Sequence, residues 1–296
     1  MFNKQLNSFF DYLTYEKKFS THTITSYKND LFQFILFINP SEEEFSISEI
    51  NYQHIRAWVT NLIKHKIASR SVNRKLSSLK SFFKYLQRQQ IIEINPLSKI
   101  SGPKTPKRLP VFVDEQQMEN LFLDVVFEEG FNGQRDRLIL DLLYQTGIRR
   151  SELTHLKETD VDLFNSTIKV LGKRNKERLI PISLELKRNL DDYLSVKRAL
   201  NISNIMLLVT EKGNAISEQA VYKSVKNYLS QVTTIQKKSP HVLRHTFATH
   251  LLNNGADINA VKDLLGHANL SATQVYTHNT IDKLKKSYKQ AHPRGD

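Results

Sequence analysis

Four short patterns in the second half of the chain gather side chains that suit chemistry at a phosphate group. In chain order they are TGIRRSEL from Thr146, LGKRNKERLIPIS from Leu171, HVLRHTFATHLL from His241 and LLGHANLSATQVYTH from Leu264. Their arginines can bind phosphate oxygens in a bidentate manner, and their lysines and histidines can move protons. The last pattern adds a tyrosine, whose hydroxyl can act as a nucleophile. Together these residue types would suit transesterification at a phosphodiester.

Each of these residues also has an ordinary explanation when it is taken alone. Tyr276 is one of 11 tyrosines, and a single tyrosine is more often a core or surface residue than a nucleophile. His241 and His245 stand four residues apart, as a zinc pair on a helix does, but Glu does not follow the first and the chain has no cysteine. Arg149 could simply pair with Glu152. We therefore expect no metal site, and we base the functional interpretation on the patterns together.

The elements around these patterns are mostly helices. Apolar periodicity predicts helices over 136–145, 184–200, 218–231, 242–253, 258–265 and 281–289. Gly147 is the expected end of the first of them, and a new helix should begin near Arg149. The β-branched runs Ser166–Leu171 and Arg178–Ile182 flank GKRNKE, which predicts a hairpin.

The first hundred residues read as helices. Apolar stripes run over Thr23–Ile38, with Thr21 as the expected N-cap, over Ile55–Ile63, and along a helix that begins near Arg70. The inward residues of that third helix should be Val72, Leu76, Leu79, Phe83 and Leu86. The segment SGPKTPKRLP, residues 101–110, is rich in Pro and cations and is expected to be an interdomain linker.

The charge of the chain favours a polyanionic partner. The formal net charge is +13 and the pI is about 9.6. Ten of the cations lie between residues 51 and 100, where Glu93 is the one acid. The outer face of the third helix could be an ordinary solvated face, but its Arg, Lys and Ser side chains without acids favour phosphate contacts. The predicted DNA-binding residues are Arg70, Arg74, Lys84 and Arg88.

In this order and spacing, the four patterns resemble the tyrosine recombinase family of integrases, and within it the Xer-type site-specific recombinases. SYKNDLFQF and VNRKLSSLKSFFKYL resemble the family's helical core-binding domain, and AHPRG resembles an Xer terminus. The resemblance covers nearly the whole chain. It implies a mainly α, two-domain DNA clamp. Residues 1–100 would form an N-terminal helical core-binding (SAM-like) bundle, 101–110 a linker, and 111–296 a C-terminal α-rich catalytic domain with a small antiparallel β-sheet.

The resemblance also implies that the protein cleaves and rejoins duplex DNA through a 3′-phosphotyrosyl intermediate. The residues that fall on the family's catalytic positions are Arg149, Lys173, His241, Arg244, His267 and the nucleophile Tyr276. Two guanidiniums would neutralise the charge of the pentacoordinate phosphate, so no metal or other cofactor is expected.

The same resemblance assigns the proton transfers. His241 would be the base and His267 a hydrogen-bond donor to the phosphate, while Glu152 would orient an arginine. Lys173 would protonate the leaving 5′-oxygen. Arg174 stands where the family commonly has Gly, which leaves open whether Lys173 or Lys176 reaches that oxygen.

Other expectations concern partners and location. The family implies a tetramer on two DNA duplexes that exchanges strands through a Holliday junction, alone or with a paralogous recombinase, and a DNA translocase as a possible regulator. The helix after Tyr276, with Ile281, Leu284 and Tyr288 inward, is expected to dock into a neighbouring subunit. No membrane partner is expected. The lack of cysteine and of a recognisable secretory signal fits the cytoplasm.

Three alternative functions remain at this point. The protein could be the integrase of a mobile element rather than an Xer enzyme that resolves chromosome or plasmid multimers. It could be a type IB topoisomerase, which the short chain and the docking helix disfavour. It could also be a DNA-binding module without catalysis, which the complete set of six residues disfavours.

Overall fold

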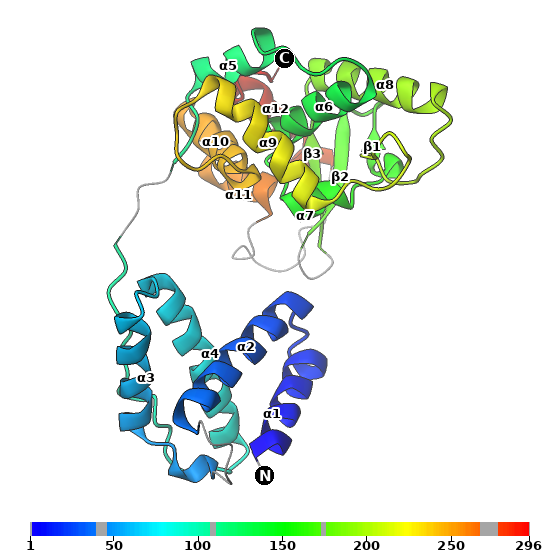
Figure 1. Ribbon diagram of the computed structural model, residues 1–296. Helices are drawn as coiled ribbons and strands as arrows, with labels where there is room; N and C mark the ends of the chain where they lie inside the picture. Colours follow the sequence, from blue (N-terminus) through cyan, green and yellow to red (C-terminus); the bar gives the residue numbers. More distant parts are fainter. Residues whose placement is uncertain (1, 40–45, 107–110, 173–175, 267–277, 296) are drawn as a thin grey trace. The chain divides into compact units, whose positions relative to one another are not determined.

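The computed structural model describes residues 2–39, 46–106, 111–172, 176–266 and 278–295, with side chains from residue 4 and, in the last range, from residue 284. The chain divides into two compact units, Met1–Arg108 and Leu109–Asp296, each with its own apolar core (Figure 1). The boundary between the units falls within segment 101–110. None of the described helices is long and apolar enough to cross a membrane.

The first unit is made of helices. They are α1 (Phe2–Asp11), the π-helical turn η1 (Tyr12–Glu16), α2 (Thr21–Ile38), the 3₁₀ turn η2 (Ile47–Glu49), α3 (Tyr52–Lys64) and α4 (Ser69–Arg88). The predicted N-cap of α2 is wrong by one residue. Thr21 is already helical, and the hydroxyl of Ser20 accepts the backbone N–H of Thr23 at 3.4 Å.

The long helix α4 supplies one side of this core. All five side chains that its sequence places inward are buried: Val72, Leu76, Leu79, Phe83 and Leu86. They pack with residues of α1, α2 and α3, among them Phe9, Phe34 and Trp58. Since the apolar side of α4 is used in this way, its polar side faces outward with Arg70, Lys84 and Arg88 exposed.

The second unit combines helices with a small sheet that lies at one side of it (Figure 1). The helices are α5 (Glu115–Leu123), α6 (Phe131–Thr146), α7 (Arg150–Thr154), η3 (Glu158–Asp160), α8 (Leu184–Ala199), α9 (Glu218–Val232), α10 (Pro240–Asn253), α11 (Ile258–Leu265) and α12 (His278–Ala291). The strands β1 (Val161–Asp162), β2 (Thr167–Leu171) and β3 (Glu177–Pro181) form one antiparallel sheet in the order β1-β2-β3. The predicted hairpin is confirmed as β2–β3, in which Leu171 pairs with Glu177. Strand β1 has only two residues and was not predicted.

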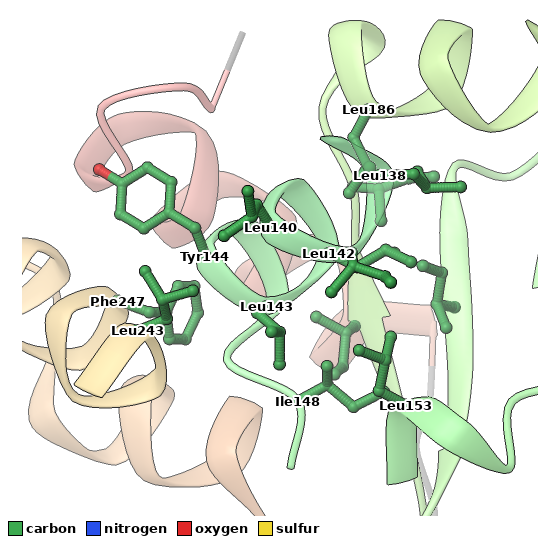
Figure 2. Packing of buried hydrophobic residues seen from close by; sticks show 14 of the residues in the cluster. Leu138, Leu140, Leu142, Leu143, Tyr144, Ile148, Leu153, Leu186, Leu243 and Phe247 are labelled. Atoms are coloured by element: carbon green, nitrogen blue, oxygen red, sulfur yellow. The ribbon is translucent and has the colours of Figure 1, made fainter. Parts of the chain in front are cut away.

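Helix α6 runs through the centre of the second unit. Its second half, from Leu138 to Thr146, is buried on all sides, because α8, α9 and α10 pack around it. Figure 2 shows Leu186 of α8 and Phe247 of α10 among the core residues around this helix. The helix ends at Gly147, in the left-handed region with φ +58°. A Cβ there would lie 2.4 Å from Cδ1 of Phe247, so the turn requires glycine. This turn leads the chain directly to Arg149.

Helix α12 packs against its own unit through two of the side chains expected to face inward. Leu284 and Tyr288 are buried in the core of the second unit. The Tyr288 hydroxyl donates to Gln145 Oε1 at 3.1 Å. Past the helix, Arg294 donates to the buried Asp141 at 2.9 Å and to Glu185 at 3.0 Å. These polar contacts hold the end of the chain against its own unit, a feature that apolar periodicity alone does not reveal.

Candidate active site

Arg149 lies where the end of α6 meets the start of α7. Its backbone N–H donates to Glu152 Oε2 at 2.9 Å, so Glu152 closes the first turn of α7. Its Nη1 donates to Glu152 Oε1 at 2.6 Å, and its Nη2 donates to the carbonyl of Gly266 at 3.2 Å. About a quarter of the side chain (24%) stays exposed. The guanidinium is therefore fixed from two sides and still open to a ligand.

Glu152 is buried between two arginines. Arg178 of β3 donates to its two carboxylate oxygens at 3.1 and 2.7 Å, opposite the contacts from Arg149. Burial would raise the pKa of Glu152, but the hydrogen bonds and charge of Arg178 and the bonds from Arg149 outweigh it and lower the pKa to about 2. The carboxylate is thus ionised at neutral pH, and it contacts Arg149 as an orienting group would.

Arg178 is the residue of this site that the sequence reasoning missed. Its side chain is 4% exposed. It shares the inward face of β3 with Ile180, two residues on. One signal was available in the sequence, an arginine at an inward position of a predicted strand. A guanidinium buried there needs hydrogen-bond acceptors, and the folded structure shows which groups these are.

Arg244 enters the site from the first half of α10. Its Nη1 donates to the carbonyl of Gly147, and its Nη2 donates to the carbonyl of Leu265 at 2.6 Å. Burial and the neighbouring charges of Arg149 and Arg178 lower the pKa of Arg244 to about 9. The guanidinium is still charged at pH 7, and a nearby anion would stabilise that charge.

The three arginines meet at the C-terminal end of α11. Three successive carbonyls, those of Leu264, Leu265 and Gly266, accept from Arg178, Arg244 and Arg149 in that order. The last carbonyls of a helix have no partner within the helix and carry its negative partial charge, so they attract cations. Gly266 ends the helix with φ +63°. We call Arg149, Arg178, Arg244 and Glu152 the arginine cluster; three positive groups in it face one negative group.

His241 is the second residue of the same helix, three residues before Arg244. Its side chain is largely exposed, and its partial burial, followed by the positive charges of Lys237 and Arg150, lowers its pKa. The imidazole is therefore neutral at pH 7 and able to accept a proton. Arg150 itself pairs with Glu218 at 2.5 Å. Within the described ranges, no three His, Asp or Glu side chains gather as metal ligands do.

Lys173, His267 and Tyr276 lie outside the described residues, and the structure places only their neighbours in the chain. Gly172 donates to the carbonyl of Lys176 at 2.7 Å across the hairpin. A Cβ at Gly172 would lie 3.7 Å from Glu152 Oε1, so this end of the hairpin borders the arginine cluster. Gly266, which directly precedes His267, also contacts the cluster. The described contacts thus reach Gly172, directly before Lys173, then Lys176 across the hairpin, and the residue before His267.

In the first unit, the four predicted DNA-binding residues lie on α4. Arg74 binds both oxygens of the buried Asp30, Nη2 to Oδ1 at 2.8 Å, and its side chain is still 49% exposed. Lys75 and Ser78 contact the same carboxylate at 3.2 and 2.8 Å. Arg88 donates to the Tyr12 hydroxyl at 3.2 Å. The ion pair with Asp30 therefore fixes the position of the Arg74 guanidinium.

Comparison with known proteins agrees with this architecture. Residues 112–283 match the sequence model of the phage integrase family, and residues 6–90 match that of the phage integrase N-terminal SAM-like domain. Tyrosine recombinase XerC of Staphylococcus saprophyticus subsp. saprophyticus is 44% identical over 283 residues, 95% of each chain. Tyrosine recombinase XerC of Staphylococcus aureus (strain USA300) is 39% identical over 289 residues, 97% of this chain and 96% of its own.

Among solved structures, the XerH site-specific recombinase in a post-cleavage complex with a palindromic difH substrate has the same fold. Its TM-score is 0.71 at 24% identity, over 89% of this chain and 78% of that one. The family expected from the four sequence patterns is thereby confirmed. The chain belongs to the phage integrase family as a Xer-type tyrosine recombinase, an enzyme of site-specific DNA strand cleavage and exchange.

Proposed function

We propose that the enzyme cleaves duplex DNA at one specific site, with Tyr276 as the nucleophile. The phenolic oxygen attacks the scissile phosphorus and its proton passes to His241. The bond from phosphorus to the 5′-oxygen breaks, and Lys173 donates a proton to that oxygen. The product is a 3′-phosphotyrosyl link, and the reverse reaction with another 5′-hydroxyl completes strand exchange. Because the link conserves the phosphodiester energy, no nucleotide cofactor takes part.

The observation that carries this proposal is the arginine cluster. A pentacoordinate phosphate gains negative charge on its non-bridging oxygens, and fixed positive groups lower its energy. Arg149 and Arg244 are both held by backbone carbonyls at the end of α11. Since Glu152 is the one acid that contacts the three arginines in the part of the chain that the structure describes, the site favours an added anion. In this proposal Arg149 and Arg244 form an arginine clamp on the scissile phosphate.

Two further features support the assigned roles. The lowered pKa of His241 keeps the imidazole neutral, as a base for the Tyr276 proton must be. The hairpin end at Gly172 borders Glu152, which supports a lysine of that turn as the general acid. His267, next to Gly266, is proposed to donate a hydrogen bond to the phosphate.

DNA binding by the first unit is a separate part of the proposal. The XerH structure carries DNA, and the net charge of +13 in this chain suits the same ligand. We assign phosphate contacts to Arg70, Arg74, Lys84 and Arg88 on the outer face of α4. Residues 1–100 would form the core-binding domain and 111–296 the catalytic domain, which close on the duplex as a clamp.

The biological role rests on family membership alone. We propose that a tetramer, alone or with a paralogous recombinase and under control of a DNA translocase, resolves chromosome or plasmid multimers in the cytoplasm. Docking of α12 into a neighbouring subunit stays part of this proposal.

The experiment begins by finding the site. The protein is incubated with sheared DNA of its host cell, covalent complexes are trapped, and the DNA ends are sequenced. The native enzyme and Tyr276→Phe are then compared on a nicked duplex that contains that site. The variant keeps the ring and lacks only the attacking oxygen, so it should bind the duplex as the native enzyme does and form no covalent complex. A covalent complex formed by the Phe variant would point to another nucleophile.

A further inference from the structure

Arg178 is a buried cation to which the proposed reaction gives no role. Its Nε donates to the carbonyl of Leu264 at 2.9 Å, and its two terminal nitrogens donate to Glu152. The side chain is 4% exposed. A guanidinium that is enclosed in this way cannot serve as a surface phosphate contact, and its partners show what it does instead.

Each oxygen of Glu152 is shared by Arg149 and Arg178. Oε1 accepts Arg149 Nη1 at 2.6 Å and Arg178 Nη1 at 3.1 Å. Oε2 accepts the Arg149 backbone N–H at 2.9 Å and Arg178 Nη2 at 2.7 Å. Without Arg178 the buried carboxylate would have Arg149 as its one cationic partner among the described residues. It would then draw that guanidinium into a full bidentate pair. Fewer donors of Arg149 would then remain for a phosphate.

Arg178 also lies against the turn that ends α11. A Cβ at Gly266 would lie 3.1 Å from Arg178 Cδ and 3.3 Å from its Nη1. The same turn provides the Gly266 carbonyl that holds Arg149 Nη2. One side chain therefore fixes both supports of Arg149, the carboxylate on one side and the carbonyl turn on the other.

We propose that Arg178 is a positioning residue for recombination: it shares Glu152 with Arg149 and thereby leaves the Arg149 guanidinium free to bind the scissile phosphate. The inference rests on the proposed arginine clamp. It also explains how Glu152 can orient Arg149. When Arg178 shares the negative charge of the carboxylate, Glu152 aligns the Arg149 guanidinium without neutralising it.

The test compares two substrates that differ at the scissile position, a normal phosphate and a methylphosphonate, whose neutral group needs no charge clamp. Single-turnover cleavage is measured at saturating protein. Arg149→Ala is the reference variant. Its cleavage rate should fall on the order of 10²-fold on phosphate but much less on methylphosphonate. Arg178→Met should show the same pattern, because a displacement of about 1 Å at a reacting centre can cost 10²-fold. Arg178→Lys, which keeps the charge, should recover part of the loss.

Arg135→Met is the matched control. Arg135 is also a mostly buried arginine of the second unit, paired with Asp136 at 2.7 Å, but it lies on the first turns of α6. It should change cleavage of the two substrates by the same factor.

Each outcome decides between the two proposals. Equal losses on both substrates for Arg178→Met, or no loss on phosphate, would overturn the positioning role. If both Arg178→Met and Arg149→Ala lose cleavage rate specifically on the phosphate substrate, the positioning role is supported. If Arg149→Ala itself shows no phosphate-specific loss, the clamp fails first. If Arg178→Met does not fold, the ratio of rates on the two substrates for Arg178→Lys decides in its place.

Discussion

Buried carboxylates hold arginines in both units, but the two arrangements differ in charge and exposure. In the second unit Glu152 accepts hydrogen bonds from Arg149 and Arg178. Arg244 lies beside them and donates to backbone carbonyls, with no carboxylate partner among the described residues. In the first unit Asp30 serves Arg74 and Lys75, and the Arg74 side chain is 49% exposed, against 24% for Arg149. The arginine cluster is thus more enclosed and more positive.

This difference separates the two kinds of DNA contact that one enzyme needs. Fixed charges in an enclosed site act strongly on a single phosphate, where charge develops during reaction. A half-exposed guanidinium, screened by water and salt, contributes to affinity along the backbone. Variants of the arginine cluster should therefore change the cleavage rate, and variants of α4 should change binding.

The largest effect is expected from Arg244→Ala. Its guanidinium is held by the carbonyls of Gly147 and Leu265, and in our account it stabilises the transition state directly. Cleavage at saturating protein should fall on the order of 10²-fold or more. Arg244→Lys should recover little, since lysine lacks the bidentate geometry. An unchanged rate at saturation would remove Arg244 from the clamp.

The hairpin lysines should separate in a leaving-group test. A 5′-bridging phosphorothiolate has a leaving group of low pKa that needs no proton. Lys173→Ala should be slow on normal DNA and much faster on the sulfur substrate, whereas Arg244→Ala should stay slow on both. Rescue of Lys176→Ala instead would move the general acid by three residues, and rescue of neither would assign the proton to another source.

A smaller effect, on binding alone, is expected from Arg74→Ala. The salt dependence of DNA affinity should weaken by about one phosphate contact, with the cleavage rate at saturation unchanged. Arg198→Ala, on the exposed last turn of α8, controls for the loss of one surface charge. A fall in the saturated rate comparable to that of Arg244→Ala would erase the distinction between the two units.

His292 should make the second unit sensitive to acid. The ring donates from Nε2 to the Tyr144 carbonyl and accepts the Arg294 backbone N–H at Nδ1. Burial, with the nearby His250 and Arg294, lowers its pKa to about 3 from 6.5. The unfolded chain therefore binds the proton first, so stability is present above pH 6.5 and falls below it, by up to about 1.4 kcal/mol per pH unit.

Denaturant unfolding between pH 7.5 and 5 measures this slope. His292→Gln should reduce it, because glutamine cannot take up the proton, and the lowered pKa values of His241 and His250 account for the rest. Glu152, with its lowered pKa of about 2, loses its contribution only between pH 4.5 and 2 and does not interfere. Equal slopes for the native chain and the variant would show that His292 does not carry the effect.

No change is expected when metal ions are removed. In our account the arginine cluster supplies the positive charge at the phosphate, so cleavage should persist in excess EDTA. The measurement is the single-turnover rate with EDTA, with spermidine as a control for general charge screening. Activity lost in EDTA and restored by Mg²⁺ but not by spermidine would contradict the account.

Local patterns predicted much of this fold. Helix α11 has the predicted bounds, and β2–β3 pair as a hairpin, because apolar periodicity and turn residues are local signals. Helix α6 begins at Phe131, five residues before its predicted start, because polar residues and Gly133 interrupt the periodicity of its first turns. Family patterns likewise supplied Arg149, Glu152 and Arg244.

Long-range polar contacts were not predictable in the same way. The role of Arg178 depends on Leu264, which is 86 residues away, and the packing of α12 on its own unit depends on Arg294 and Asp141, 153 residues apart. Such contacts involve backbone carbonyls and buried acids that have no periodic signature. They appear only when the fold brings the partners together.

The most direct test of the central claim is the identity of the covalent link. The trapped protein–DNA complex is digested with nuclease and protease, and the modified peptide is sequenced by mass spectrometry. We expect one nucleotide joined through its 3′-phosphate to Tyr276, with a free 5′-hydroxyl on the released strand. A link to any other side chain, or a link through a 5′-phosphate, would contradict it.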